Sequence, residues 1–273
     1  MDIQLNEQPL MIADGTTLFA LRERCEPAAD LIIHNGYPAA EDRPLAEGDC
    51  VVLIRKGEIP SHQELEGLLA ARHTPGVHER LRSASVGIAG AGGLGSTAAI
   101  ALARSGIGRL VIADFDVVEP SNLNRQQYFI DQIGQAKVEA LRENLLRINP
   151  YVEVAIFCGR LTPANVPDVF AEVDVLVEAF DAADQKAMLV ESFLGARPGI
   201  PLVAASGMAG CGPANTVVTR RIGRNLYLVG DGETAARPGE GLMSPRVGVA
   251  AHHQANAVLQ LLLGEIPGQE QRS

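Results

Sequence analysis

A glycine-rich segment with the sequence GAGGLG constrains the fold of this chain more than any other feature. It contains Gly90, Gly92, Gly93 and Gly95, and it stands between an apolar run at residues 86–89 and a helical pattern at residues 96–104. Glycines at such a junction let the backbone approach a phosphate, and the first N–H groups of the helix donate hydrogen bonds to it. The segment therefore predicts a strand, a nucleotide-binding turn and a helix.

A glycine-rich turn can also form only because a helix and a strand pack closely, without binding a nucleotide. A second residue that binds the nucleotide is therefore needed to support the interpretation. Asp114 is that residue, at the end of the next apolar run and about 20 residues after the loop, where dinucleotide-binding folds place the acid that binds ribose hydroxyls. The strand, the helix and Asp114 together favour nucleotide binding.

The rest of the chain after residue 83 alternates between strand and helix patterns. This alternation predicts a Rossmann-like, doubly wound, mainly parallel sheet over residues 83–273. A late hairpin is expected at residues 215–220 and 226–229, and a final amphipathic helix at residues 248–263. The other expected elements are strands at 110–113, 152–157, 173–178 and 201–205 and a helix at 137–149.

The first part of the chain has a different pattern. Two short alternating strands, a helix near residues 16–25 and two further strands predict a small α+β domain of the β-grasp type over residues 1–58. Residues 59–82 are charged, and their pattern predicts a helical connector with a break at Thr74-Pro75-Gly76.

Composition excludes several functional classes. The chain has 33 acidic and 23 basic residues, a net charge of −10, so we expect no general nucleic-acid binding, which needs a basic surface. Four cysteines without a CxxC pair favour a reducing, cytoplasmic setting. The N-terminal segment lacks the pattern of a secretory leader, and no apolar run reaches the ~18 residues of a membrane span.

Two cations and a carboxylate beyond the loop suggest a triphosphate rather than a nicotinamide. Arg125 and Lys137 are suited to holding the β- and γ-phosphates, and Asp181, after a later strand, is suited to holding Mg²⁺. Taken singly, the two cations are equally consistent with surface residues, and Asp181 is equally consistent with a helix cap.

Taken together, these segments resemble those of a known family. Residues 83–205 look like the adenylating domain of ThiF, MoeB and HesA and of ubiquitin-activating enzymes. The resemblance rests on the GAGGLG loop, the segment DFDVVEPSNLNRQ at 114–126, Lys137 and the segment EAFDAAD at 178–184. Residues 1–58 resemble, more weakly, the β-grasp sulfur carrier ThiS.

The resemblance implies roles for individual residues. The four loop glycines would lie under the nucleotide, Asp114 would bind the ribose, and Asp116 would support the loop. Asn122, Arg125 and Lys137 would contact the phosphates, and Asp181 would bind Mg²⁺. An arginine from the partner subunit of a homodimer would complete the site, for which Arg72 is the best match.

Two departures from the family pattern matter. The paired CxxC motifs that hold structural zinc in many relatives are missing here, so no structural zinc is expected. Some relatives use a late cysteine in sulfur transfer. Cys211 is the candidate, but its small neighbours favour a buried apolar role over a reactive thiol.

The predicted activity is ATP-dependent adenylation of the C-terminal carboxylate of a small β-grasp sulfur carrier, with thiamine-precursor sulfur transfer as the favoured pathway. Three alternatives stay open: a relative that adenylates a small molecule or a tRNA base, a nicotinamide-dependent oxidoreductase, and an ATP-binding regulatory module. Residues 1–58 are not expected to be the substrate, because the chain continues past Gly57 without a free Gly-Gly carboxylate.

Overall fold

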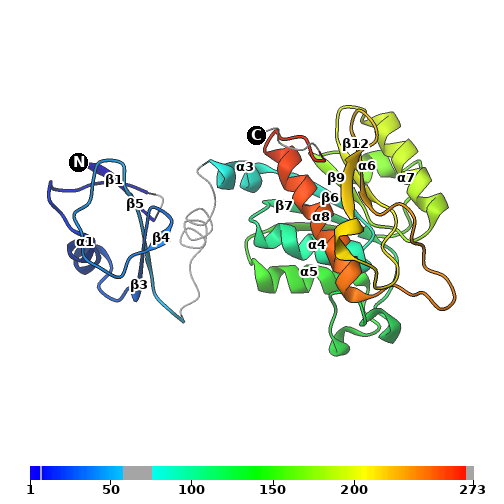
Figure 1. The fold of residues 1–273 in the computed structure, drawn as a ribbon, viewed down its shortest axis with the longest axis horizontal. Helices are drawn as coiled ribbons and strands as arrows, with labels where there is room; N and C mark the ends of the chain where they lie inside the picture. The colour runs from blue at the N-terminus through cyan, green and yellow to red at the C-terminus, as the bar shows by residue number, and fades with distance from the viewer. Residues whose placement is uncertain (7, 58–75, 269–273) are drawn as a thin grey trace. The chain divides into compact units, whose positions relative to one another are not determined.

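The computed structural model describes residues 1–6, 8–57 and 76–268. The chain divides into two compact units, Met1–His78 and Glu79–Ser273, and each has its own sheet (Figure 1). None of the helices in the described ranges has the length and apolar character needed to span a bilayer.

The N-terminal unit is a β-grasp. Its sheet has the strand order β2-β1-β5-β3-β4, with β1 and β5 parallel and the other neighbours antiparallel. Helix α1 (Leu18–Cys25) packs on this sheet through Leu18 and Leu21, and Thr17 caps it by accepting a hydrogen bond from the backbone N–H of Ala20. The strands are β1 (Asp2–Leu5), β2 (Gln8–Met11), β3 (Leu31–His34), β4 (Tyr37–Pro38) and β5 (Cys50–Ile54).

The second unit contains a seven-stranded sheet in the order β11-β12-β10-β9-β6-β7-β8. All neighbouring strands are parallel except β11 and β12, which form the late hairpin. The predicted doubly wound, mainly parallel sheet is therefore confirmed. The strands are β6 (Ser85–Ala89), β7 (Arg109–Asp114), β8 (Glu153–Cys158), β9 (Val175–Glu178), β10 (Leu202–Ala205), β11 (Val218–Arg221) and β12 (Leu226–Gly230).

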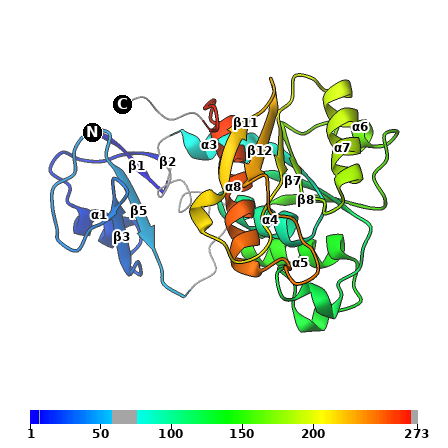
Figure 2. The ribbon, with the colours of Figure 1, turned by 45° about the vertical axis from the view of Figure 1, so that its right-hand side comes forward.

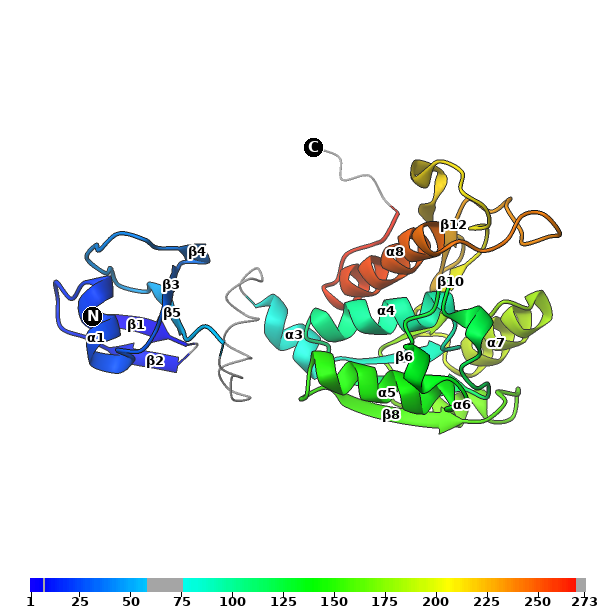
Figure 3. The same ribbon diagram turned by 90° about the horizontal axis from the view of Figure 1, so that it is seen from below.

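Helices cover both faces of this sheet, which explains why its central strands read as apolar runs. On one face α4 lies between α5 and α8, and on the other α6 packs against α7 (Figures 2 and 3). Short 3₁₀ turns are η1 (Pro120–Asn122), η2 (Ile130–Gln132) and η3 (Ala214–Thr216). The helices are α3 (Val77–Ser83), α4 (Gly93–Arg104), α5 (Lys137–Ile148), α6 (Val166–Val169), α7 (Ala183–Ala196) and α8 (Ser244–Leu262).

Several helices differ from the sequence prediction. Helix α4 begins at Gly93 rather than at residue 96, and the sequence pattern does not predict α6. Helix α7 was not predicted, because it buries only Leu189 and Phe193 and so has a weak apolar stripe. Helix α8 begins at Ser244 rather than at residue 248, since Pro245 occupies the first turn, where proline is tolerated.

The strand order reverses at β6, which pairs with β7 on one side and with β9 on the other. In open α/β sheets this reversal opens a crevice at the carboxyl ends of the strands. The strand register of β6, β7 and β9 places Ala89, Ala113 and Glu178 side by side at that edge.

We predict that Gly95→Ala destabilises the second unit. A Cβ at Gly95 would lie 1.8 Å from the carbonyl oxygen of Gly90, so α4 would have to move away from β6. Gly248, in α8, is the matched control, because a Cβ there would meet no atom within 4 Å. Urea unfolding should give a loss of about 1–3 kcal/mol for Gly95→Ala and no loss for Gly248→Ala. Equal stabilities would contradict the close approach of α4 to β6.

Candidate functional site

A cavity of about 600 Å³ opens at the carboxyl edge of the seven-stranded sheet. This volume is typical of small-molecule sites. The structure brings most of the residues predicted from the sequence to its wall: Gly90, Gly92, Gly93, Asp114, Asp116, Arg125, Lys137 and Asp181.

The glycine loop has the conformation that its residues predict. Gly90 has a φ of +101°, and a Cβ there would lie 2.8 Å from the carbonyl oxygen of Ala179. Both carboxylate oxygens of Asp114 accept backbone hydrogen bonds, from Ala91 at 2.6 Å and from Asp116 at 2.8 Å. Asp114 thus joins the glycine loop to the segment after β7. Gly95 does not line the cavity, and it allows α4 to start close to β6.

Lys137 is buried and ion-paired. Its Nζ lies 2.8 Å from Oδ2 of Asp116, and its backbone N–H donates to the Asp116 carbonyl oxygen at 2.9 Å. Asp116 is half exposed, so the pair lies at the boundary between the protein interior and the cavity. A phosphate oxygen entering the cavity would compete with this carboxylate for the ammonium group.

Arg125 is held by the turn that carries it. Its Nη1 donates to Oδ1 of Asn124 at 2.8 Å and to the carbonyl oxygen of Ser121 at 3.3 Å. Asn122 is buried and does not line the cavity: its Oδ1 accepts from the backbone N–H of Glu119 at 3.1 Å. The structure gives Asn122 a role in shaping this turn, and its contact with phosphate stays a prediction.

Tyr128 supports the loop from behind, and sequence reasoning missed it. Its buried hydroxyl donates to the carbonyl oxygen of Ala91 at 2.7 Å. Burial, together with the charge of Asp114, raises the pKa of Tyr128 far above its ordinary value, so the phenol stays a neutral donor. The only signal was its position two residues after Gln126, at the end of the predicted phosphate segment.

Asp181 lies on the loop between β9 and α7 and faces the cavity. It does not cap α7, because the N-cap is Ala182 and no side chain caps the helix; the helix-cap alternative is therefore wrong. Within the described residues, no group of three or more His, Cys, Asp and Glu side chains is arranged to hold a metal ion. A single carboxylate fits Mg²⁺ only where phosphate and water oxygens supply the other ligands.

A second ion pair, which the sequence analysis did not predict, reaches the cavity wall through Lys186. Glu178 is fully buried, and Nζ of Lys186 lies 2.8 and 3.0 Å from its two carboxylate oxygens. The same ammonium donates to the carbonyl oxygen of Ala205 at 3.1 Å, which ties the ends of β9 and β10 together. Burial raises the pKa of Glu178, and the charge of Lys186 opposes that rise.

Besides Gly95 and Asn122, one further predicted residue, Cys211, does not line the cavity. Arg72 lies outside the described residues, so its role stays a prediction. Cys211 is exposed and does not line the cavity, so the expectation that it is buried was wrong. It follows β10 in a loop whose next residues, Gly212 to Thr216, are also exposed.

Two family profiles match the chain. The profile of the ThiF family matches residues 67–273, and that of the ThiS-like ubiquitin family matches residues 1–57. The chain is 35% identical over 191 residues to the molybdopterin-synthase adenylyltransferase of Escherichia coli, covering 68% of this chain and 76% of that protein. It is 30% identical over 241 residues to the adenylyltransferase and sulfurtransferase UBA4 of Kluyveromyces lactis, covering 86% of this chain and 52% of that protein.

Solved structures share the fold. The tRNA N6-threonylcarbamoyladenosine dehydratase TcdA of E. coli, in complex with ATP, superposes with a TM-score of 0.68 at 24% identity, covering 76% of this chain and 98% of that one. The ThiF profile spans more than half of the chain, and the predicted family resemblance is confirmed. The chain belongs to the ThiF family, and its N-terminal region is ThiS-like.

Proposed function

We propose that this chain catalyses ATP-dependent adenylation of the C-terminal carboxylate of a small ubiquitin-like sulfur carrier. One observation carries the proposal: a single cavity collects the glycine loop, the cations of Arg125 and Lys137, and the carboxylate of Asp181. The relatives are named adenylyltransferases, which supports adenylate transfer as the reaction class.

The nucleotide fits the half of the cavity over β6, β7 and β8. Phosphate oxygens would accept hydrogen bonds from the N–H groups of the glycine loop and the start of α4. Asp114 would accept hydrogen bonds from the ribose hydroxyls, because its carboxylate faces the cavity while fixing the loop.

In the reaction, a carboxylate oxygen of the carrier attacks the α-phosphorus of ATP. The bond from that phosphorus to the bridging oxygen breaks, and pyrophosphate leaves with its electron pair. The attacking carboxylate is already ionised, so no general base is needed. Arg125 and Lys137 would stabilise the charge that develops on the leaving group, Lys137 by exchanging Asp116 for a phosphate oxygen. Asp181 would hold Mg²⁺, which would supply further positive charge to the phosphates.

Several finer features belong to this proposal. We infer a homodimer in which Arg72 of one subunit completes the site of the other, and a cytoplasmic role in thiamine-precursor sulfur transfer. Residues 1–58 and 83–273 would be the two domains, with 59–82 as their connector. The net charge of −10 gives no support to a tRNA substrate.

We predict that Arg125→Ala and Asp181→Ala each lower carrier-dependent ATP–pyrophosphate exchange by one to three orders of magnitude, about 1.4 kcal/mol per decade. Both variants remove charge that faces the phosphates. Arg104→Ala and Asp184→Ala are matched controls, because both residues are exposed and neither lines the cavity. Unchanged exchange in both cavity variants would refute the assignment.

We predict that residues 1–57 are not the adenylated substrate. The last strand of the β-grasp, β5, ends at Ile54, and the chain continues past Gly57, so Gly57 has no free C-terminal carboxylate. Intact-mass measurement after incubation with Mg²⁺ and ATP should show no AMP adduct when no carrier is added. An adduct mapped to residues 1–57 would overturn this view.

We predict that folding does not depend on zinc. A structural zinc site needs four ligands, usually thiolates in CxxC pairs, and the sequence has no such pair. Elemental analysis of the purified protein should give far less than one zinc per chain, and a chelator should leave the midpoint of thermal unfolding unchanged. One equivalent of bound zinc would contradict the prediction.

A further inference from the structure

The cavity has a second half that the nucleotide residues do not line. It lies across the reversal at β6, over the ends of β10 and β12, and it is lined by Ser206, Gly207, Met208 and residues 232–236. Small and apolar side chains predominate here, and this stretch of wall contains no lysine or arginine. Such a wall suits a narrow peptide segment rather than a phosphate.

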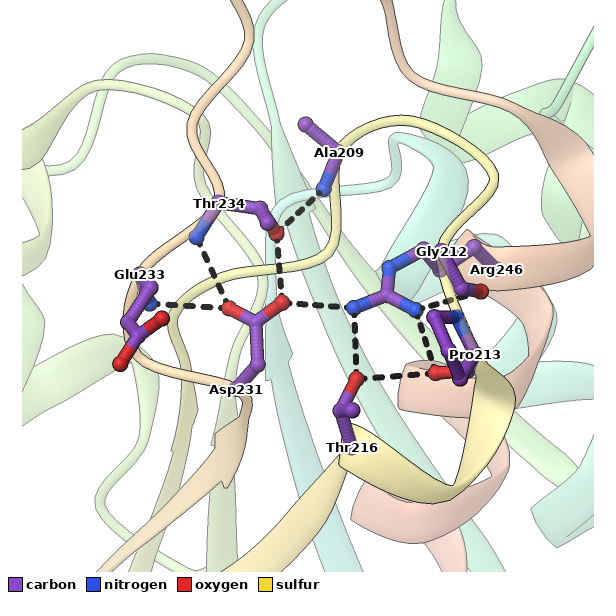
Figure 4. Close-up of polar contacts among 8 residues, drawn as sticks. All are labelled: Ala209, Gly212, Pro213, Thr216, Asp231, Glu233, Thr234 and Arg246. Atoms are coloured by element: carbon purple, nitrogen blue, oxygen red, sulfur yellow. Dashed lines mark hydrogen bonds and ion pairs between the residues drawn. The ribbon is translucent and has the colours of Figure 1, made fainter.

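A buried ion pair stands behind this wall. Nη2 of Arg246 lies 2.6 Å from Oδ2 of Asp231, and the two side chains are only 5% and 10% exposed (Figure 4). Neither residue lines the cavity. The pair therefore acts on the wall through the backbone segments to which each partner is bonded.

Arg246 holds the segment that follows β10. From the first turn of α8, its Nη1 donates to the carbonyl oxygens of Gly212 at 2.9 Å and Pro213 at 2.7 Å. Its Nη2 also donates to Oγ1 of Thr216 at 3.0 Å (Figure 4). One guanidinium thus connects α8 with the loop that leads from the cavity to η3.

Asp231 holds the segment that follows β12. Its Oδ1 accepts from the backbone N–H groups of Glu233 and Thr234, each at 2.9 Å. Its Oδ2 accepts from Oγ1 of Thr234 at 2.8 Å, and that Oγ1 accepts from the N–H of Ala209 at 3.1 Å. A Cβ at Gly207 would lie 2.0 Å from Oδ1, so the two loops meet at van der Waals distance only because residue 207 is glycine.

Asp231 is an acceptor at neutral pH. Burial alone would raise its pKa, but the hydrogen bonds from Thr234 and Glu233 and the contact with Arg246 outweigh burial and hold the pKa well below its usual range. The carboxylate therefore stays ionised wherever the enzyme is assayed near neutrality.

We propose that the Asp231–Arg246 ion pair is a positioning pair that sets the width of the second half of the cavity, and that this half receives the carboxyl-terminal segment of the carrier. This inference rests on the proposed function. Removing the pair would let the loops after β10 and β12 separate. It would weaken binding of the carrier while the glycine loop, on the other side of β6, still binds ATP.

The test compares Asp231→Asn and Arg246→Met with the native protein in pyrophosphate exchange, using a ubiquitin-like sulfur carrier that ends in Gly-Gly. We expect KM for the carrier to rise about tenfold or more, about 1.4 kcal/mol per tenfold. The Kd for Mg·ATP, measured without carrier, should change less than about threefold, under 0.7 kcal/mol by the same conversion. Arg237→Gln is the matched control, because it breaks an exposed ion pair with Glu240 in the same segment.

Hydrogen exchange separates this proposal from the proposed function. In both variants the backbone amides of residues 206–212 and 231–236 should exchange faster, while those of residues 90–95 keep their native rates. Thr234→Val replaces the hydroxyl that bridges Asp231 and Ala209 with a methyl group, and its exchange rates test the loops if the charge variants do not fold. Native rates in both loops, or an ATP Kd that rises as much as the carrier KM, would overturn the positioning role. A native protein without carrier-dependent exchange would refute the proposed function, and the loop rates would still test the pair.

Discussion

The close approach of helix α4 to strand β6 is the constraint on which the site depends. It exists because Gly95 has no side chain at the point where a Cβ would touch the carbonyl oxygen of Gly90. This contact fixes where α4 begins, and the first N–H groups of α4 then point at the cavity. Asp114 and Tyr128 hold the intervening turn through the N–H and the carbonyl oxygen of Ala91. These contacts join the sheet, helix α4 and the backbone of the glycine loop.

Paired charges surround the cavity, although the chain carries a net charge of −10. Lys137 is paired with Asp116, Lys186 with buried Glu178, and Arg246 with Asp231. The three pairs differ in what they touch. Asp116 is half exposed, so a phosphate can compete for Lys137. The other two pairs join loop ends, and breaking a buried pair leaves one charge without a partner.

The N-terminal unit has its own hydrophobic core and its own sheet. Its similarity to a sulfur carrier concerns the fold, whereas a substrate for adenylation also needs a free carboxylate, which the chain does not present after Gly57. The elements of this unit follow from local signals: a hairpin, a capped helix and two apolar runs. The parallel pairing of β1 with β5 instead joins residues far apart in the chain, such as Gln4 and Cys50.

The sequence by itself determined the fold class and one half of the site. The spacing of the glycine loop, Asp114 and the segment to Arg125 is typical of a nucleotide-binding fold. Because each follows an apolar strand, these residues lie at the carboxyl ends of β6 and β7. Only the tertiary structure showed that Asn122 shapes a turn outside the cavity, that Asp116 binds Lys137, and that Glu178 pairs with Lys186. It alone joined Asp231 to Arg246, 15 residues apart in the chain. The physical reason is that a side-chain pair across two loops depends on strand order and burial, which no short sequence pattern encodes.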